Sequence, residues 1–207
     1  MKVAVHNITG KETTKKIELS KDVFGVEPND HAIYLDVKQY LAAQRSGTHK
    51  AKERSDVKGS RRKIRKQKGS GAARVGDIKN PLFRGGGRVF GPRPRKYDFK
   101  VNKKVKRLAR KSALSYMAKD KNIIVIEDFN FDTPQTKSYA DFLSNFELLD
   151  NKTVLVLAES NKNIFLSSRN LKKARVVLAS ELNTYDVMNA NKLMVMESSI
   201  KEIEKNF

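Results

Sequence analysis

The residues of this sequence best suited to chemistry are the arginines and lysines between Arg45 and Lys100. This segment holds 19 Lys and Arg and four acidic residues, a net charge of +15 in 56 residues. It also holds nine of the chain's 11 glycines. The Arg guanidinium is a planar fork that matches phosphate oxygens, and Gly lets a backbone approach a bulky partner closely. The pattern therefore predicts binding to a polyanion through its phosphates.

The middle of this segment, from Gly59 to Gly76, reads GSRRKIRKQKGSGAARVG. Such a sequence buries too little apolar surface to offset the entropy of ordering. We therefore expect residues 45–100, here called the arm, to become ordered only when they lie against RNA. With about 28 residues in each limb, at ~3.3 Å per extended residue, the arm reaches at most about 90 Å.

The charge of the chain is concentrated in the arm and in the segment that follows it. Residues 45–111 carry a net charge of +21, and the whole chain carries +20. All other residues together therefore carry a net charge of −1. Charge this localised indicates a polyanionic partner. A basic run alone could also be a nuclear-localisation or heparin-binding patch, but the aromatic residues and prolines among its arginines favour RNA. The expected RNA contacts are Lys and Arg residues of the arm and of the next helix: Arg45, Lys50, Lys52, Arg54, Lys58, Arg61, Arg62, Lys63, Arg65, Lys66, Lys68, Arg74, Lys79, Arg84, Arg88, Arg93, Arg95, Lys96, Lys103, Lys104 and Arg107. For the helix, a solvated face is the alternative, but its continuity with the arm favours RNA contact.

Aromatic side chains are interspersed with the arginines of the arm. We expect Phe83 and Phe90 to stack on splayed bases or to pack in RNA grooves. For Tyr97 and Phe99, docking of the base of the arm onto the folded domain is an equally good interpretation.

Acidic residues follow several apolar runs, at Glu127, Asp128, Glu159, Glu181 and Glu197. Converging carboxylates at the carboxyl edge of a sheet could bind a divalent metal for phosphoryl chemistry. The favoured alternative places each acid in the first turn of the next helix, where the helix dipole stabilises it. Serines beside these acids are available as helix caps, namely Ser160, Ser180 and Ser198 or Ser199.

Other catalytic patterns are incomplete. The segment Gly69–Arg74 resembles a dinucleotide fingerprint but has Arg in place of the third Gly, and Gly85–Gly87 lacks the Lys of a phosphate loop. The three histidines have no metal-ligand spacing, and the chain has no Cys. We therefore expect no catalytic residue, no metal site and no cofactor, with magnesium acting only indirectly through folded RNA.

The rest of the sequence predicts an α/β domain. Four runs of Val, Ile and Leu read as buried strands, at Ile123–Ile126, Val154–Leu157, Arg175–Leu178 and Leu193–Val195. Helices are predicted between and after them, at Thr136–Phe146, Lys162–Asn170, Thr184–Asn189 and Ser199–Lys205. This alternation predicts a three-layer domain, in which a mainly parallel sheet of about four strands is flanked by helices.

The arm is predicted to be an insertion between two helices of this domain. One helix begins near Pro28 and ends by Gly47, and the other begins near Val101. Residues 2–8 and Lys15–Leu19 are predicted to form a peripheral hairpin. Residues 1–44 and 101–207 then form one globular domain, and 45–100 form the inserted loop. The apolar runs are too short to span a membrane.

Several motifs of the chain, in order, resemble the L-four family of bacterial large-subunit ribosomal proteins. They comprise Gln44–Gly59 with its Arg54 and Val57, the RKQKGSGxAR segment at 65–74, Gly85–Gly87 with Phe90, Lys100–Lys104, and Leu166-x-x-Arg169-Asn-Leu171. The resemblance covers the whole chain.

This resemblance implies a non-catalytic structural protein that binds 23S-type ribosomal RNA and aids its folding and assembly. It implies a cytoplasmic, ribosome-bound location, with neighbouring large-subunit proteins as partners and no homo-oligomer. The tip of the loop would line the nascent-peptide exit tunnel and contact the nascent peptide. By resemblance, the tip residues are Gln67, Lys68, Gly69, Ser70, Gly71 and Arg74.

Two other functions use the same sequence features. A metal-dependent nuclease would capture RNA with the arm and cleave it with the acidic residues. A free regulator or chaperone of RNA would have the same parts, and most of it would be found outside ribosomes.

Overall fold

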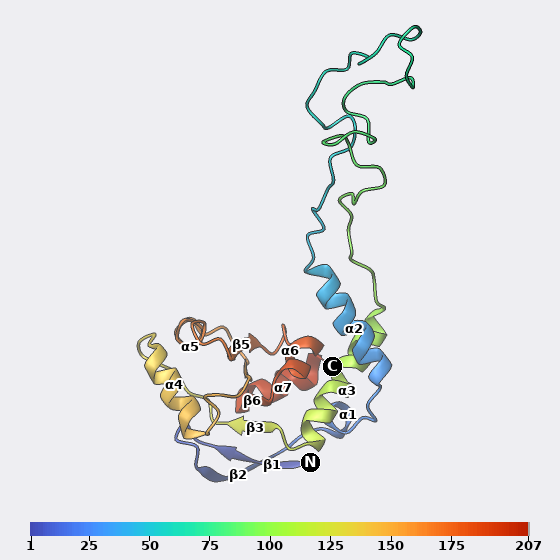
Figure 1. Cartoon of the computed structure of the whole chain (residues 1–207). Helices are drawn as coiled ribbons and strands as arrows, with labels where there is room; N and C mark the ends of the chain where they lie inside the picture. Colours follow the sequence, from blue (N-terminus) through green and yellow to red (C-terminus); the bar gives the residue numbers. More distant parts are fainter. Residues whose placement is uncertain (207) are drawn as a thin grey trace. The chain divides into compact units, whose positions relative to one another are not determined.

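The apolar runs of the sequence form the strands of one six-stranded sheet (Figure 1). The computed structural model describes residues 1–206. Its strands are β1 (Lys2–His6), β2 (Glu12–Glu18), β3 (Ile123–Ile126), β4 (Thr153–Leu157), β5 (Ala174–Leu178) and β6 (Lys192–Met196). Their order in the sheet is β2-β1-β3-β6-β4-β5. The β1–β2 pair is antiparallel, and the other four pairs are parallel.

The predicted N-terminal hairpin is confirmed, but it is not a separate peripheral element. Strand β1 pairs in parallel with β3, with Val5 opposite Val125, so the hairpin extends the main sheet. The sheet consequently has six strands instead of about four. This pairing joins segments far apart in the sequence, so no local pattern indicates it.

The helices cover both faces of the sheet. They are α1 (Lys21–Phe24), α2 (Asp30–Ala43), α3 (Lys103–Lys119), α4 (Thr136–Asn145), α5 (Lys162–Ser168), α6 (Thr184–Asn189) and α7 (Glu197–Asn206). The predicted helices are confirmed, although α2 ends four residues before Gly47. The short helix α1, capped by Ser20, was not predicted.

Alternate residues of the fully buried strand β4 point into two separate cores. Val154 and Val156 pack with apolar residues of α1, α3, α6 and α7. Leu155 and Leu157 pack on the other face with α4 and α5, including Tyr139 and Phe142. The predicted three-layer arrangement is therefore confirmed.

The chain divides into two compact units. One comprises Met1–Leu41 and the residues from Lys100 onward, and contains the sheet and both cores. The other comprises Ala42–Phe99, which beyond the end of α2 has no helix or strand. Within residues 1–206, no helix has the length and apolar character needed to cross a bilayer.

Candidate nucleic-acid interface

The arm has internal structure although it lacks helices and strands. Its two limbs run side by side (Figure 1), and backbone hydrogen bonds join them. The Ala51 N–H donates to the Pro92 carbonyl (2.9 Å), and the Arg95 N–H donates to the Gly47 carbonyl (3.1 Å). Further along, the Arg88 N–H donates to the Lys52 carbonyl (2.8 Å). The arm is thus two limbs held side by side, from which basic side chains project.

Three acidic residues of the arm form ion pairs with its own cations. Lys50 Nζ lies 2.8 Å from Asp56, Arg54 lies 3.1 Å from Asp77, and Arg93 Nε lies 2.5 Å from Glu53. The hydrogen bond between Lys50 and Asp56 raises the pKa of the lysine and lowers that of the aspartate.

The bond to Glu53 similarly raises the pKa of Arg93. Such exposed pairs stabilise a fold only slightly. Their main consequence is to orient three of the cations expected to bind phosphate.

A cation–π cluster closes the base of the arm. The ring of Tyr97 packs against two guanidinium groups, with its centroid 3.7 Å from Cζ of Arg45 and 4.6 Å from Cζ of Arg95. The Tyr97 hydroxyl lies 3.2 Å from His49 Nε2. Tyr97 therefore joins the outgoing and returning limbs to each other. We call Arg45, Gly47, His49, Arg95 and Tyr97 the neck.

The two phenylalanines predicted to stack on bases differ in accessibility. Phe90 is fully exposed, at 104% relative accessibility, with a left-handed backbone (φ 51°). It borders a hollow of about 810 Å³, which is also lined by Arg54, Arg88 and Arg93. Phe83 is half-buried within the arm. Phe90 is thus the better placed to stack on an unpaired base beside guanidinium groups.

The residues assigned to the tip by resemblance lie together in an open part of the arm. Every residue from 61 to 74 is exposed. Gly69 and Gly71 have positive φ angles, and a side chain built on either would meet nothing within 4 Å. In this segment Lys63 Nζ donates to Gln67 Oε1 at 2.5 Å.

Lys79 is the one predicted RNA contact that the structure buries, at 8% accessibility. Its carbonyl accepts from the Gly87 N–H (3.0 Å), a contact within the returning limb. All other predicted cationic contacts are exposed.

Helix α3 has the two faces that its sequence predicts. Ala109, Ala113 and Leu114 are fully buried in the domain. The expected RNA contacts Lys103, Lys104 and Arg107 are exposed. The helix can therefore present a basic face without disturbing the core.

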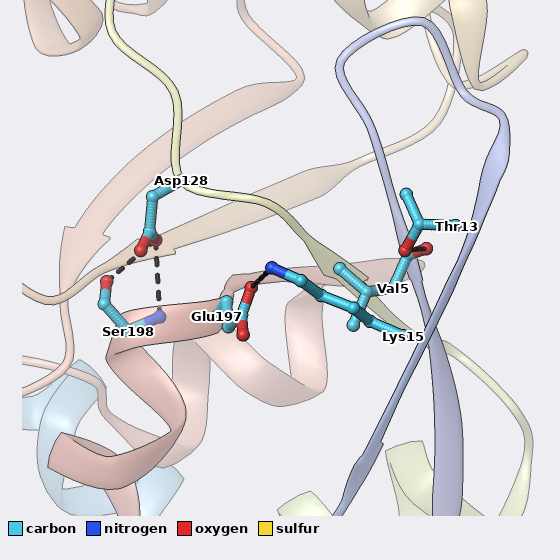
Figure 2. A network of polar contacts seen from close by, with 6 residues as sticks. All are labelled: Val5, Thr13, Lys15, Asp128, Glu197 and Ser198. Carbon is cyan, nitrogen blue, oxygen red and sulfur yellow. Dashed lines mark hydrogen bonds and ion pairs between the residues drawn. The ribbon is translucent and has the colours of Figure 1, made fainter.

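Two acidic residues at the carboxyl edge of the sheet, Asp128 and Glu197, make contacts within the domain (Figure 2). Asp128 accepts from the backbone N–H of Ser198 (3.3 Å) and from its hydroxyl (2.8 Å), at the start of α7. Glu197 lies in the first turn of α7, as predicted, and pairs with Lys15 of β2 at 3.6 Å. Among residues 1–206, no group of three or more His, Cys, Asp or Glu side chains is arranged to bind a metal.

The favoured helix-start interpretation is wrong at four of the five acids. Glu127 and Asp128 lie in the loop after β3, and the next helix, α4, begins only at Thr136. Glu159 and Glu181 precede α5 and α6 instead of lying in their first turns. The caps of these helices are Asn161 and Asn183, not Ser160 and Ser180. Asn and Ser cap helices about equally well, so sequence alone does not distinguish them.

Comparison with known proteins covers nearly the whole chain. Residues 17–206 match the model of the ribosomal protein L4/L1 family. A large ribosomal subunit protein uL4 from Christiangramia forsetii is 61% identical over 99% of this chain and 98% of its own length. Proteins of the same name from Flavobacterium johnsoniae and Parabacteroides distasonis are 60% and 58% identical, each over 100% of this chain and 99% of its own. The chain therefore belongs to the ribosomal protein L4/L1 family.

Proposed function

We propose that this protein is a structural, non-catalytic constituent of the large ribosomal subunit in the bacterial cytoplasm. The observation that carries this proposal is the match over nearly the full length to proteins named large ribosomal subunit protein uL4. Its partners are then large-subunit ribosomal RNA and neighbouring large-subunit proteins. The nuclease alternative has no support, because Asp128 and Glu197 are engaged in contacts within the domain.

In this proposal residues 45–100 are an RNA-binding loop inserted in a domain formed by residues 1–44 and 101–207. The exposed cations of the arm neutralise phosphates where RNA segments converge, and so aid folding and assembly of the RNA. Binding is driven largely by release of counterions from the RNA. Phosphate contacts position the arm but read little base sequence, so specificity comes from the shape of the RNA.

The neck and the exposed phenylalanine refine this mechanism. The neck holds the two limbs together at the base, which lowers the entropy lost when the arm binds. Phe90 stacks on an unpaired base, while Arg54, Arg88 and Arg93 around the hollow bind the adjoining phosphates. Magnesium is needed only to fold the RNA.

The tip of the arm lines the nascent-peptide exit tunnel and contacts the nascent peptide. Family resemblance supports this part of the proposal, as does the exposure of Gln67, Lys68, Ser70 and Arg74 together with the two glycines between them. A cysteine at Ser70 should form a crosslink to a stalled nascent chain through a short thiol reagent. Absence of that crosslink in translating ribosomes would show that the tip does not line the tunnel wall.

The salt dependence of RNA binding tests the role of the arm. If about ten phosphates are contacted, the log–log slope of affinity against salt should be roughly −9. A variant with five exposed arm cations replaced by Gln should reduce the slope by up to about 4.5 units. The five are Arg61, Arg62, Arg65, Lys66 and Lys68.

A matched control removes the same charge from exposed positions of the globular unit. It replaces Lys2, Lys11, Lys16, Lys137 and Lys201 by Gln. Its slope should remain close to that of the unmodified chain. If the salt slope of RNA affinity falls by the same amount in both variants, net charge rather than the arm governs binding. The proposed mechanism is then wrong.

A further inference from the structure

One acidic residue is buried within the basic arm. Asp77 is 7% exposed, whereas the other three acids of the arm, Glu53, Asp56 and Asp98, are partly or fully exposed. A carboxylate repels phosphate, so Asp77 does not contribute to the phosphate binding proposed for the arm. Its role therefore lies in another kind of contact.

Only one of the two carboxylate oxygens of Asp77 has a partner among residues 1–206. Arg54 Nη2 lies 3.1 Å from Asp77 Oδ2, and this ion pair fixes the orientation of the carboxylate. Asp77 Oδ1 is buried and has no hydrogen-bond partner. Leaving a buried polar atom unpaired is costly, and such atoms are rare in folded proteins. Oδ1 is thus an acceptor for a donor that the described part of the chain does not supply.

Lys79 is a second buried charge without a partner. It is 8% exposed, and its Nζ makes no hydrogen bond or ion pair with any of residues 1–206. Its side chain lies along Gly59, since a side chain built at Gly59 would lie 3.6 Å from Lys79 Cγ and 3.7 Å from its Cε. The ammonium group has three donors and no acceptor, so Lys79 requires an acceptor from a ligand.

Two turns bring these side chains to one hollow of about 370 Å³. In the returning limb, the Asn80 N–H donates to the Asp77 carbonyl (3.3 Å), which closes a turn that contains Lys79. In the outgoing limb, the Asp56 N–H donates to the Glu53 carbonyl (2.9 Å) and closes a second turn. The volume falls within the range of small-ligand pockets, about 300 to 1,000 Å³. The hollow lies wholly within Ala42–Phe99 and is lined by Glu53, Arg54, Ser55, Arg61, Asp77 and Lys79.

The hollow offers an acceptor and a donor to the same ligand. Asp77 Oδ1 can accept from N–H groups, and Lys79 Nζ can donate to a carbonyl oxygen. The edge of a guanine base carries both partners, because its N1–H and N2–H lie beside O6. Adenine and cytosine have no carbonyl beside their amino group, and uracil has a single N–H on its pairing edge. Guanine therefore matches this pair of side chains most fully.

We propose that this hollow binds one unpaired guanine of large-subunit RNA, whose N1–H and N2–H donate to Asp77 and whose O6 accepts from Lys79. The Arg54 side chain, 57% exposed, stacks on the base, and the exposed Arg61 binds the adjoining phosphate. The inference rests on the proposed ribosomal function for the identity of the RNA. It adds one base-specific contact to an arm that otherwise recognises the shape of the RNA.

Chemical probing of guanines tests this site. A glyoxal reagent that reacts with N1 and N2 of unpaired guanines is applied to large-subunit RNA, both free and assembled with the full-length chain. The unmodified chain should protect one guanine that Asp77→Asn leaves reactive, because a neutral amide is a weaker acceptor than a carboxylate. Lys79→Met should weaken the protection of the same guanine.

The matched control is Asp56→Asn. It also removes one negative charge and one ion pair from the arm, that with Lys50, but Asp56 does not line the hollow. Protection of the guanine should persist in this variant. Its loss in Asp56→Asn would assign the effect to charge alone and overturn the inference.

Two further outcomes separate failure of this inference from failure of the proposed function. An identical pattern of protected guanines in the unmodified chain and in Asp77→Asn would overturn the guanine site and leave the role of the arm intact. Absence of any protection of the RNA by the unmodified chain would contradict RNA binding itself, on which the inference rests.

Replacing the protected guanine by adenine in the RNA gives a quantitative test. This change should lower the affinity of the unmodified chain about tenfold, as expected for loss of one good base contact. The affinity of Asp77→Asn should fall much less, because its contact to the base is already lost. Titration of both RNAs with both chains measures the four affinities. A merely structural role of Asp77 predicts equal effects of the base change in the two chains, and that result would overturn the inference.

Discussion

A single glycine has an unusually constrained position in the neck of the arm. Gly47 has a φ of 59°, and a side chain there would collide with the carbonyl of Arg95 and approach the Tyr97 ring at 3.1 Å. Replacing Gly47 by Ala should therefore break the Arg95–Gly47 hydrogen bond and separate the limbs. We expect RNA affinity to fall about tenfold, corresponding to a backbone cost of about 1 to 2 kcal/mol.

The control for this substitution is Gly85→Ala. Gly85 also has a positive φ of 79°, but a side chain there would meet nothing within 4 Å. Titration of both variants with large-subunit RNA should show a clearly larger loss for Gly47→Ala. Equal losses would mean that backbone preference alone, and not closure of the neck, determines the effect.

Asp186 predicts a pH dependence of folding stability. Burial raises its pKa, while Arg175 and the hydrogen bond from Asn183 partly oppose that shift. A raised pKa means that the folded state holds the proton more tightly than the unfolded state. The contribution of this carboxyl to stability is therefore lost as pH rises from its unfolded pKa, about 3.9, through its folded pKa.

The variant Asp186→Asn does not titrate at this position. The free energy of unfolding of the unmodified chain, minus that of the variant, should decrease as pH rises through this acidic window. Denaturant unfolding at a series of pH values measures the difference. Asp141→Asn, at an exposed position of α4, controls for the loss of a negative charge. A difference that grows with pH would contradict the assigned cause.

At the scale of elements, the arm should be dispensable for folding. All strands and both sets of buried apolar side chains lie outside residues 44–100. Deletion of residues 48–98 should leave a folded, monomeric domain with the helix and strand content of the sheet and its covering layers. Circular dichroism and sedimentation velocity check this expectation. An unfolded or aggregated product would mean that the arm is part of the core.

The elements themselves could largely be predicted from sequence. The runs at β3, β4, β5 and β6 are uninterrupted and short, as expected of strands buried on both faces. The parallel pairing of β1 with β3 could not be predicted, because it depends on tertiary packing. The caps Asn161 and Asn183 were missed because a serine shortly before each of them satisfies the same local preference.

At the scale of the whole molecule, sequence located the charge but not its arrangement. The excess of arginine and lysine in the arm is evident from composition. Sequence spacing does not show which acids face which cations, so the pairs of Glu53, Asp56 and Asp77 were not predicted.

Sedimentation shows directly whether the chain is a constituent of the large ribosomal subunit. Cells producing the tagged chain are lysed in magnesium buffer, and the lysate is separated on a sucrose gradient after a high-salt wash. The intact chain should travel with large subunits and intact ribosomes, and the chain lacking residues 48–98 should remain largely at the top. If the intact chain itself remains at the top, it is not a ribosomal constituent, and the free regulator becomes the better explanation.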